Sequence, residues 1–94
     1  MKIVIHEAAV ADLEAIFAWI SHDSPKAAAA VVRRIRTRIN ILGRPGLARI
    51  GRPGLTPGTR ELVEGPYIVV YEVDAPAQQI TVLAVVHGAR DRQR

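Results

Sequence analysis

The sequence predicts an α+β fold in which a helical hairpin packs on one face of a small antiparallel sheet. Three observations predict it: an apolar alternation near the amino terminus, two successive segments with helical periodicity, and three apolar runs separated by turn residues. The resulting order is β-α-α-β-β-β, with the helices segregated from the sheet. A chain of 94 residues suffices for one hydrophobic core, so we expect residues 1–94 to form a single domain.

The first strand is expected at residues 2–6, where Ile3 and Ile5 share one face and Val4 takes the other. From Glu7 the period changes to that of an amphipathic helix. One stripe of this helix collects the apolar side chains of Val10, Leu13, Ile16, Phe17 and Ile20. Residues 21–25 end this helix and begin the next.

The second helix is expected from Pro25 to about Leu42. Ser24 is suited to the N-cap, and proline is well tolerated at the first helical position. Gly43 is expected to end the helix at the C′ position. Because the connection is so short, the two helices should form an antiparallel hairpin.

The segment that follows contains the pentapeptide Gly-Arg-Pro-Gly-Leu twice, at residues 43–47 and 51–55. We interpret the copies as successive turns, with proline setting φ and glycine supplying positive φ. The segment also carries Arg44, Arg49 and Arg52. A connection of this length inside a small domain is usually functional or mobile.

Three strands are expected at residues 59–63, 67–73 and 79–86, joined by short turns into an antiparallel meander. The last run is almost continuously apolar. We therefore expect it to be a central strand that is buried on both faces.

The net charge of +4 conceals a strong segregation of charge. Between Ser24 and Arg60 the chain has nine basic residues and no acidic one, whereas the remainder has four basic and nine acidic residues. A segregated positive field favours an anionic partner, either nucleic acid or an acidic protein segment. The alternative is a solvated helix face next to a basic loop.

Several classes of function are disfavoured. The chain has no cysteine, which excludes disulfides, cysteine–zinc sites and thiol nucleophiles. The three histidines are far apart in sequence, so no metal site is expected, and no standard catalytic or cofactor-binding signature is present. There is neither a membrane-spanning run nor a signal peptide, so we expect a cytoplasmic protein that does not associate with membranes.

Residues 8–90 contain eight segments that together resemble the ParE/RelE superfamily of bacterial toxins from type II toxin–antitoxin systems, and the fold of that superfamily matches the predicted order. The segments are Ala9-x-x-Asp12-Leu13-x-x-Ile16, Trp19-Ile20, Ser24-Pro25-Lys26-Ala-Ala, Leu42-Gly-Arg-Pro, Gly51-Arg-Pro-Gly, Gly58-Thr-Arg-Glu-Leu-Val, Tyr67-Ile-Val-Val-Tyr71 and Val82-Leu-Ala-Val-Val-His87-Gly-Ala-Arg90.

The resemblance implies one of two activities. RelE-like members cleave mRNA on the ribosome, whereas ParE-like members lack the nuclease residues and act on DNA gyrase. Arg60 and His87 match positions at which nucleolytic relatives carry arginine and a catalytic histidine. However, Gly88 stands where a tyrosine commonly follows that histidine, and the paired lysines of RelE have only Arg49 and Arg52 as nearest cations. These departures favour a gyrase inhibitor.

We therefore expect the toxin component of a type II toxin–antitoxin system of the plasmid-stabilization kind, which inhibits gyrase by binding and needs no cofactor or metal. The expected target-binding residues are Arg60, His87, Arg90, Arg49 and Arg52. One alternative is a ribosome-dependent mRNA endonuclease with Arg60 and His87 as catalytic residues, so enzymatic activity stays open. Another is an antitoxin-binding module whose toxicity has decayed.

The resemblance also implies a cognate antitoxin that binds through an acidic, partly disordered C-terminal segment and forms a hetero-oligomer with this chain. The expected antitoxin-binding residues are Trp19, Arg33, Arg34, Arg36 and Arg38. Direct binding of nucleic acid is secondary. Structural roles remain open for three of the features above: an Arg60–Glu61 ion pair, a hydrogen-bonded His87, and core packing of Tyr67 and Tyr71.

Overall fold

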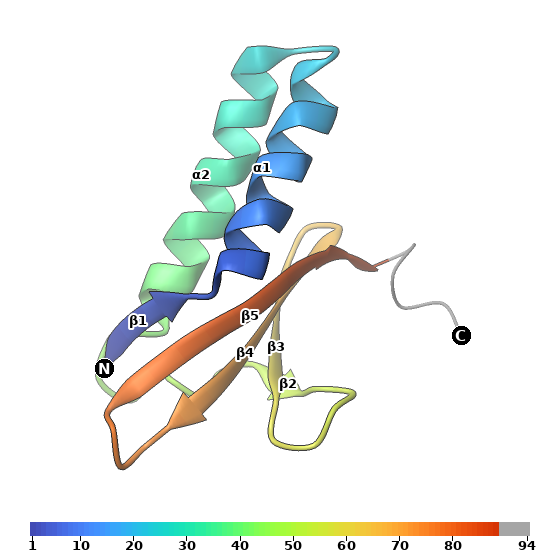
Figure 1. Ribbon diagram of the computed structural model, residues 1–94. Coiled ribbons are helices and arrows are strands. Elements are labelled where there is room, and N and C mark those ends of the chain that lie inside the picture. The colour runs from blue at the N-terminus through green and yellow to red at the C-terminus, as the bar shows by residue number, and fades with distance from the viewer. Residues whose placement is uncertain (89–94) are drawn as a thin grey trace.

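The computed structural model describes residues 1–88 and confirms the predicted α+β class, because two helices pack on one face of a five-stranded sheet (Figure 1). The elements are β1 (Lys2–Ile5), α1 (Glu7–Ser21), α2 (Pro25–Ile41), β2 (Arg52–Pro53), β3 (Arg60–Glu64), β4 (Tyr67–Asp74) and β5 (Gln79–His87). All six predicted elements are present near their predicted bounds, and β2 is additional. Neither helix in this part of the chain is both long and apolar enough to cross a membrane.

The sheet is mixed, with the strand order β1-β5-β4-β3-β2. β1 pairs with β5 in parallel, with Ile3 opposite Ile80, and every other pair is antiparallel. The prediction of an antiparallel sheet is therefore wrong at β1. Local sequence patterns identify strands but do not say which strands pair, and this pairing joins the two ends of the described chain.

The helical hairpin buries one side and leaves its tip uncovered. Leu13 of α1 and Ile35 and Ile39 of α2 are buried in the core. Phe17, which the periodicity placed on the apolar stripe, is 41% exposed, and Trp19 is 71% exposed. The reason is visible in Figure 1, where the end of the hairpin extends beyond the sheet.

Both ends of α2 lie where the sequence predicts them. Ser24 caps the start as expected, since its Oγ accepts a hydrogen bond from the Ala27 N–H at 3.1 Å. At the other end Leu42 is the C-cap, so Gly43 stands at C′ as predicted, although its φ is not positive. A Cβ atom there would lie 3.1 Å from the Met1 carbonyl oxygen and 3.2 Å from Ile3 Cδ1, so this glycine permits close approach of β1.

The core lies between the helices and the inner face of the sheet, where Tyr67, Val69 and Tyr71 of β4 are buried. The inner face of β5 is also buried, but the side chains of Leu83 and Val86 are only half-buried. The prediction that β5 is buried on both faces is wrong, because the helices cover only one face.

The two pentapeptide copies have different conformations. The first is a turn in which Gly46 has φ = +78°. In the second, Arg52 and Pro53 form β2 and pair with Glu61 and Arg60 of β3. The prediction of two successive turns is therefore wrong for the second copy, which contains a short strand. Proline is tolerated here because β2 is an edge strand. No further strand lies beyond it, so the N–H that proline lacks is not needed for a hydrogen bond to one.

Candidate functional site

The basic loop between α2 and β3 is held by a clamp of three residues, Arg60, Tyr71 and Gly51. Arg60 Nη2 donates hydrogen bonds to the Arg49 carbonyl at 3.0 Å and to the Gly51 carbonyl. The buried Tyr71 hydroxyl accepts a hydrogen bond from the Gly51 N–H at 3.0 Å. A Cβ atom at Gly51 would lie 2.6 Å from the Glu61 carbonyl oxygen, so only glycine fits here without displacement.

A second contact fixes the loop to β3. Arg52 Nε lies 3.1 Å from Glu61 Oε1, and the side chain of Arg52 is 56% exposed while that of Glu61 is 1% exposed. Arg60 therefore donates to loop carbonyls, and Glu61 pairs with Arg52 across β2 and β3. This arrangement replaces the Arg60–Glu61 ion pair that was considered as a structural alternative.

The clamp brings two of the three predicted cations, Arg49 and Arg60, to one shallow hollow. The Arg49 side chain is exposed, and it lines a shallow hollow together with Arg60. The other residues that line this hollow are Pro53, Gly58, Thr59 and Val73. Arg49 and Arg60 thus form one basic surface, which we call the loop surface. Arg52 directly precedes Pro53 of this hollow, but its side chain pairs with Glu61 and does not line it.

His87 does not belong to the loop surface. Arg60 is opposite Tyr71 in the sheet, whereas His87 is opposite Tyr67, four residues earlier in β4. Two strand spacings of about 4.8 Å and four residues of about 3.3 Å place the Cα atoms of Arg60 and His87 about 16 Å apart. A nuclease needs its base and its phosphate-binding cation at one phosphodiester, whereas these two residues line different hollows.

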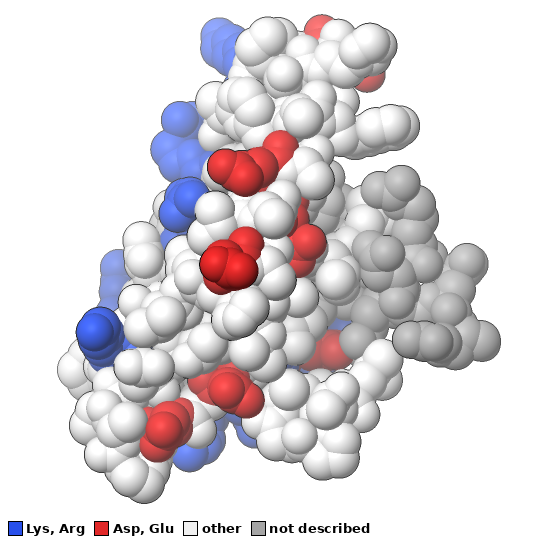
Figure 2. All heavy atoms as spheres, viewed as in Figure 1, with Lys and Arg blue, Asp and Glu red and all other residues white. Residues whose placement is uncertain are grey.

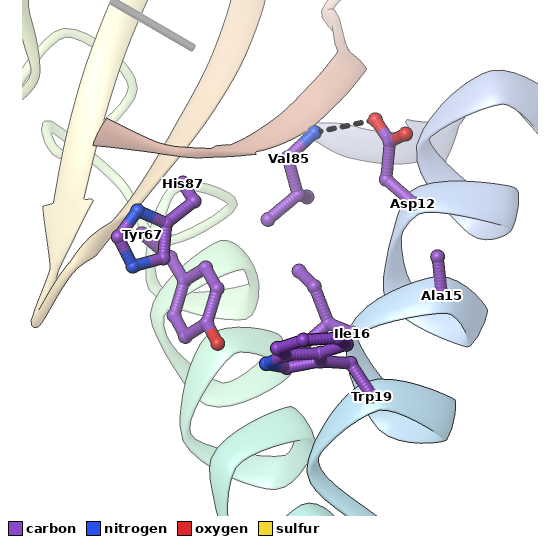
Figure 3. A pocket seen from close by; sticks show the side chains of 7 residues that line it. All are labelled: Asp12, Ala15, Ile16, Trp19, Tyr67, Val85 and His87. Atoms are coloured by element: carbon purple, nitrogen blue, oxygen red, sulfur yellow. Dashed lines mark hydrogen bonds between the residues drawn. The ribbon is translucent and has the colours of Figure 1, made fainter. Parts of the chain in front are cut away.

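His87 instead belongs to a pocket between α1 and the ends of β4 and β5 (Figure 3). Its ring lies edge-on to the Tyr67 ring, with centroids 5.5 Å apart and an interplanar angle of 86°. Asp12 of α1 accepts a hydrogen bond from the Val85 N–H at 2.9 Å. The residues lining this pocket, which we call the α1–β5 pocket, are Asp12, Ala15, Ile16, Trp19, Tyr67, Val85 and His87.

The exposed face of α2 carries most of the remaining positive charge. Arg33, Arg34 and Arg36 are exposed and have no ion-pair partner among residues 1–88. Arg38 differs, because its Nε lies 3.4 Å from Glu64 Oε1 and its Nη2 donates to the Val63 carbonyl at 3.4 Å. Arg38 therefore ties α2 to β3.

Beside these arginines, a groove runs between α2 and the turn that joins β3 to β4. Its apolar part includes Val31, Ile35 and Pro66, and Arg34 and Glu64 lie at its rim. We call this the α2 groove. An apolar floor with a mostly basic rim suits an amphipathic, acidic segment.

The predicted site residues consequently fall on three surfaces. Trp19 lines the α1–β5 pocket, separate from the α2 groove lined by Arg34, so the expected antitoxin-binding set is divided. Arg90 lies outside the described residues. Within residues 1–88 no cluster of three metal-ligating side chains occurs.

Sequence reasoning missed Asp12 as a pocket residue and Tyr71 as the partner of Gly51. The only sequence signal for Asp12 is its position off the apolar stripe of α1, which many solvated acids share. For Tyr71 there is no such signal, because a core tyrosine and one that binds a loop have the same alternation pattern.

These features define a small α+β protein that has a basic loop fixed to its sheet and a helical hairpin with a basic helix α2. A family model described as "ParE toxin of type II toxin-antitoxin system, parDE" matches residues 3–92, and the chain therefore belongs to the ParE toxin family. The protein of Sinorhizobium fredii named "Putative toxin Y4kP" is 40% identical over 78 residues, which cover 81% of this chain and 76% of that protein.

Two solved structures have the same fold. A chain of the chromosomal ParDE toxin–antitoxin system from P. aeruginosa has a TM-score of 0.81 and 26% identity, covering 93% of this chain and 95% of that one. A chain of the RelBE2 toxin–antitoxin complex from Mycobacterium tuberculosis has a TM-score of 0.63 and 25% identity, covering 92% and 88%. This chain is a toxin of the type II toxin–antitoxin class.

Proposed function

We propose that this toxin acts in the cytoplasm, inhibits DNA gyrase by binding to it, and is neutralised by a cognate antitoxin. Membership of the ParE family supports the choice of target. The placement of Arg60 and His87 in two different hollows, with Cα atoms about 16 Å apart, is the observation that favours binding over RNA cleavage, because a nuclease gathers its base and its phosphate-binding cation at one site. The Arg60 guanidinium is, in addition, already engaged by two loop carbonyls.

The loop surface is the part of the toxin that would contact the target. Its cations come from a loop fixed at Gly51 and Glu61, so little conformational entropy is lost when a partner binds. Arg49 would make the direct contact because its side chain is exposed, and Arg52 would contribute with its exposed part. Arg60 would act mainly by holding the loop, and His87 and Arg90 would contribute outside the loop surface.

The antitoxin would occupy the α2 groove. The two similar structures come from toxin–antitoxin systems, which supports a partner of this kind. An acidic segment would pair with Arg33, Arg34 and Arg36 and place apolar side chains against Val31 and Ile35. Binding of such a segment would also stabilise the folded toxin through mass action.

The first experiment compares the supercoiling activity of gyrase with purified wild-type toxin and two variants. Wild type should inhibit supercoiling and trap cleaved DNA, and the cognate antitoxin should reverse the effect. Arg49→Gln should weaken inhibition about two- to fivefold, as expected for loss of one exposed charge contact. Arg36→Gln removes the same charge from α2 and should leave inhibition unchanged.

Unaltered supercoiling at high micromolar toxin would contradict the gyrase proposal. The same preparation is then added to ribosome-bound mRNA, where cleavage would favour the RelE-like alternative and make His87 the next residue to replace. A toxin that binds its antitoxin but has neither effect would correspond to decayed toxicity.

Antitoxin binding is tested with the complementary pair of variants. The double variant Arg33→Gln, Arg34→Gln should weaken antitoxin binding about three- to twentyfold, from two exposed ion pairs, and reduce its salt dependence. Arg49→Gln should bind the antitoxin like wild type. Equal weakening by both variants would mean that general charge attraction, rather than the α2 groove, determines binding.

A further inference from the structure

The two helices of the hairpin carry charges of opposite sign. The acidic side chains of α1 are Glu7, Asp12 and Glu14, and this helix has no lysine or arginine. α2 has five basic residues and no acidic one. Figure 2 shows the acidic side chains on the face over α1 and the basic side chains along the margin formed by α2. A segment that suits α2 therefore has the wrong charge for α1.

The α1–β5 pocket lies on the acidic side and has aromatic walls. Trp19 and Asp12 approach it from α1, and Tyr67 and His87 approach it from the strands (Figure 3). Trp19 is 71% exposed, so most of its surface is accessible to a partner. The pocket thus combines three aromatic rings with one carboxylate.

We propose that the α1–β5 pocket receives a basic side chain, arginine or lysine, from a partner protein. A cation over the face of tryptophan or tyrosine is attracted by the negative face of the ring, and a nearby carboxylate adds a charge-assisted hydrogen bond. The pocket is therefore complementary to a segment of opposite character to the acidic segment expected at the α2 groove. This inference does not depend on gyrase being the target.

Asp12 has the geometry to take part in such recognition. One of its carboxylate oxygens, Oδ2, accepts from the Val85 N–H, which fixes the orientation of the group. The other oxygen has no hydrogen-bond partner among residues 1–88 and can accept from an incoming donor. The Val85 N–H at the edge of β5 is already hydrogen-bonded. A partner would therefore bind the pocket through a side chain and not by adding a strand at that position.

Trp19 is the only tryptophan of the chain, so its fluorescence reports directly on the pocket. The full-length toxin, without antitoxin, is titrated with N-acetyl-arginine amide and, separately, with the neutral isostere N-acetyl-citrulline amide. We expect a saturable change with the arginine probe in the millimolar range and at least fivefold weaker binding of citrulline. Equal responses to the two probes, or no saturable response to arginine, would overturn the proposal.

Two charge variants locate the effect. Asp12→Asn keeps an acceptor for Val85 and should weaken arginine binding about two- to fivefold. Glu14→Gln removes the same charge from an exposed position of α1 outside the pocket and should bind arginine like wild type. Equal weakening by both would show attraction to the helix as a whole and refute a defined pocket. If Asp12→Asn fails to fold, the comparison of the arginine and citrulline probes on the wild-type toxin still tests whether the pocket selects a basic side chain.

Discussion

Replacement of Tyr71 by phenylalanine should destabilise the toxin through the loss of one buried hydrogen bond. Tyr71 has no exposed surface, and its hydroxyl is the acceptor for the Gly51 N–H at 3.0 Å. The variant keeps the ring in the core but leaves that N–H without its acceptor, at a cost of about 1–2 kcal/mol. For a chain of this size, the melting temperature should fall by about 5–15 °C. Thermal and urea unfolding followed by circular dichroism measure both quantities.

The effect should also be local to the loop. Trypsin does not cleave arginyl–proline bonds, so Arg49–Ile50 is the only cleavable bond of residues 43–58, and mass spectrometry identifies the cut. Loosening the clamp by about 1–2 kcal/mol should raise the cleavage rate there about five- to thirtyfold. Tyr67→Phe is the matched control, because the Tyr67 hydroxyl has no hydrogen bond among residues 1–88. Equal destabilisation and equal cleavage in the two variants would refute the clamp.

Two further pairs of substitutions test the packing of the loop and the start of α2. Gly51→Ala should cost about 1–3 kcal/mol, because the new methyl group would overlap the Glu61 carbonyl, whereas Gly46→Ala, with open space around it, should cost only about 1 kcal/mol from its positive φ. Unfolding midpoints that rank these two in the opposite order would contradict the stated contact. Ser24→Ala should lower stability by about 1 kcal/mol through loss of the N-cap, and Ser21→Ala, which removes no cap, should change it by less than about 0.5 kcal/mol. Equal losses in the two serine variants would argue against the cap.

The helical hairpin was predictable because its signals are local. Periodicity identified the buried side of both helices, and Ser24 with Pro25 marked the start of α2 within one residue. The strand pairing was not predictable in the same way. The parallel contact of β1 with β5 depends on residues far apart in the chain, on which a local pattern carries no information. The pairing of Arg52 with Glu61 spans only nine residues, but the turn residues around it gave no sign of a strand.

The site was predictable in residue type but not in role. An arginine at position 60 was expected to face a target, and residue type alone could not distinguish this from donation to the loop carbonyls of Arg49 and Gly51. The basic character of α2 was read correctly from composition. That the basic face of α2 and Trp19 lie on different surfaces could not be predicted, because the path of the hairpin over the sheet decides which surface each helix presents.

The α1–β5 pocket follows from the way in which the chain leaves the sheet. The pairing of β1 with β5 ends at Val82, and Leu83 has no partner in the β4–β5 register, so the remainder of β5 turns a backbone edge toward α1. An exposed edge donor invites pairing with another chain. Asp12 satisfies the Val85 N–H at that edge and thereby places a fixed carboxylate beside Trp19 and Tyr67. The same residue thus leaves no unsatisfied donor at Val85 and supplies the charge by which a basic side chain would be selected.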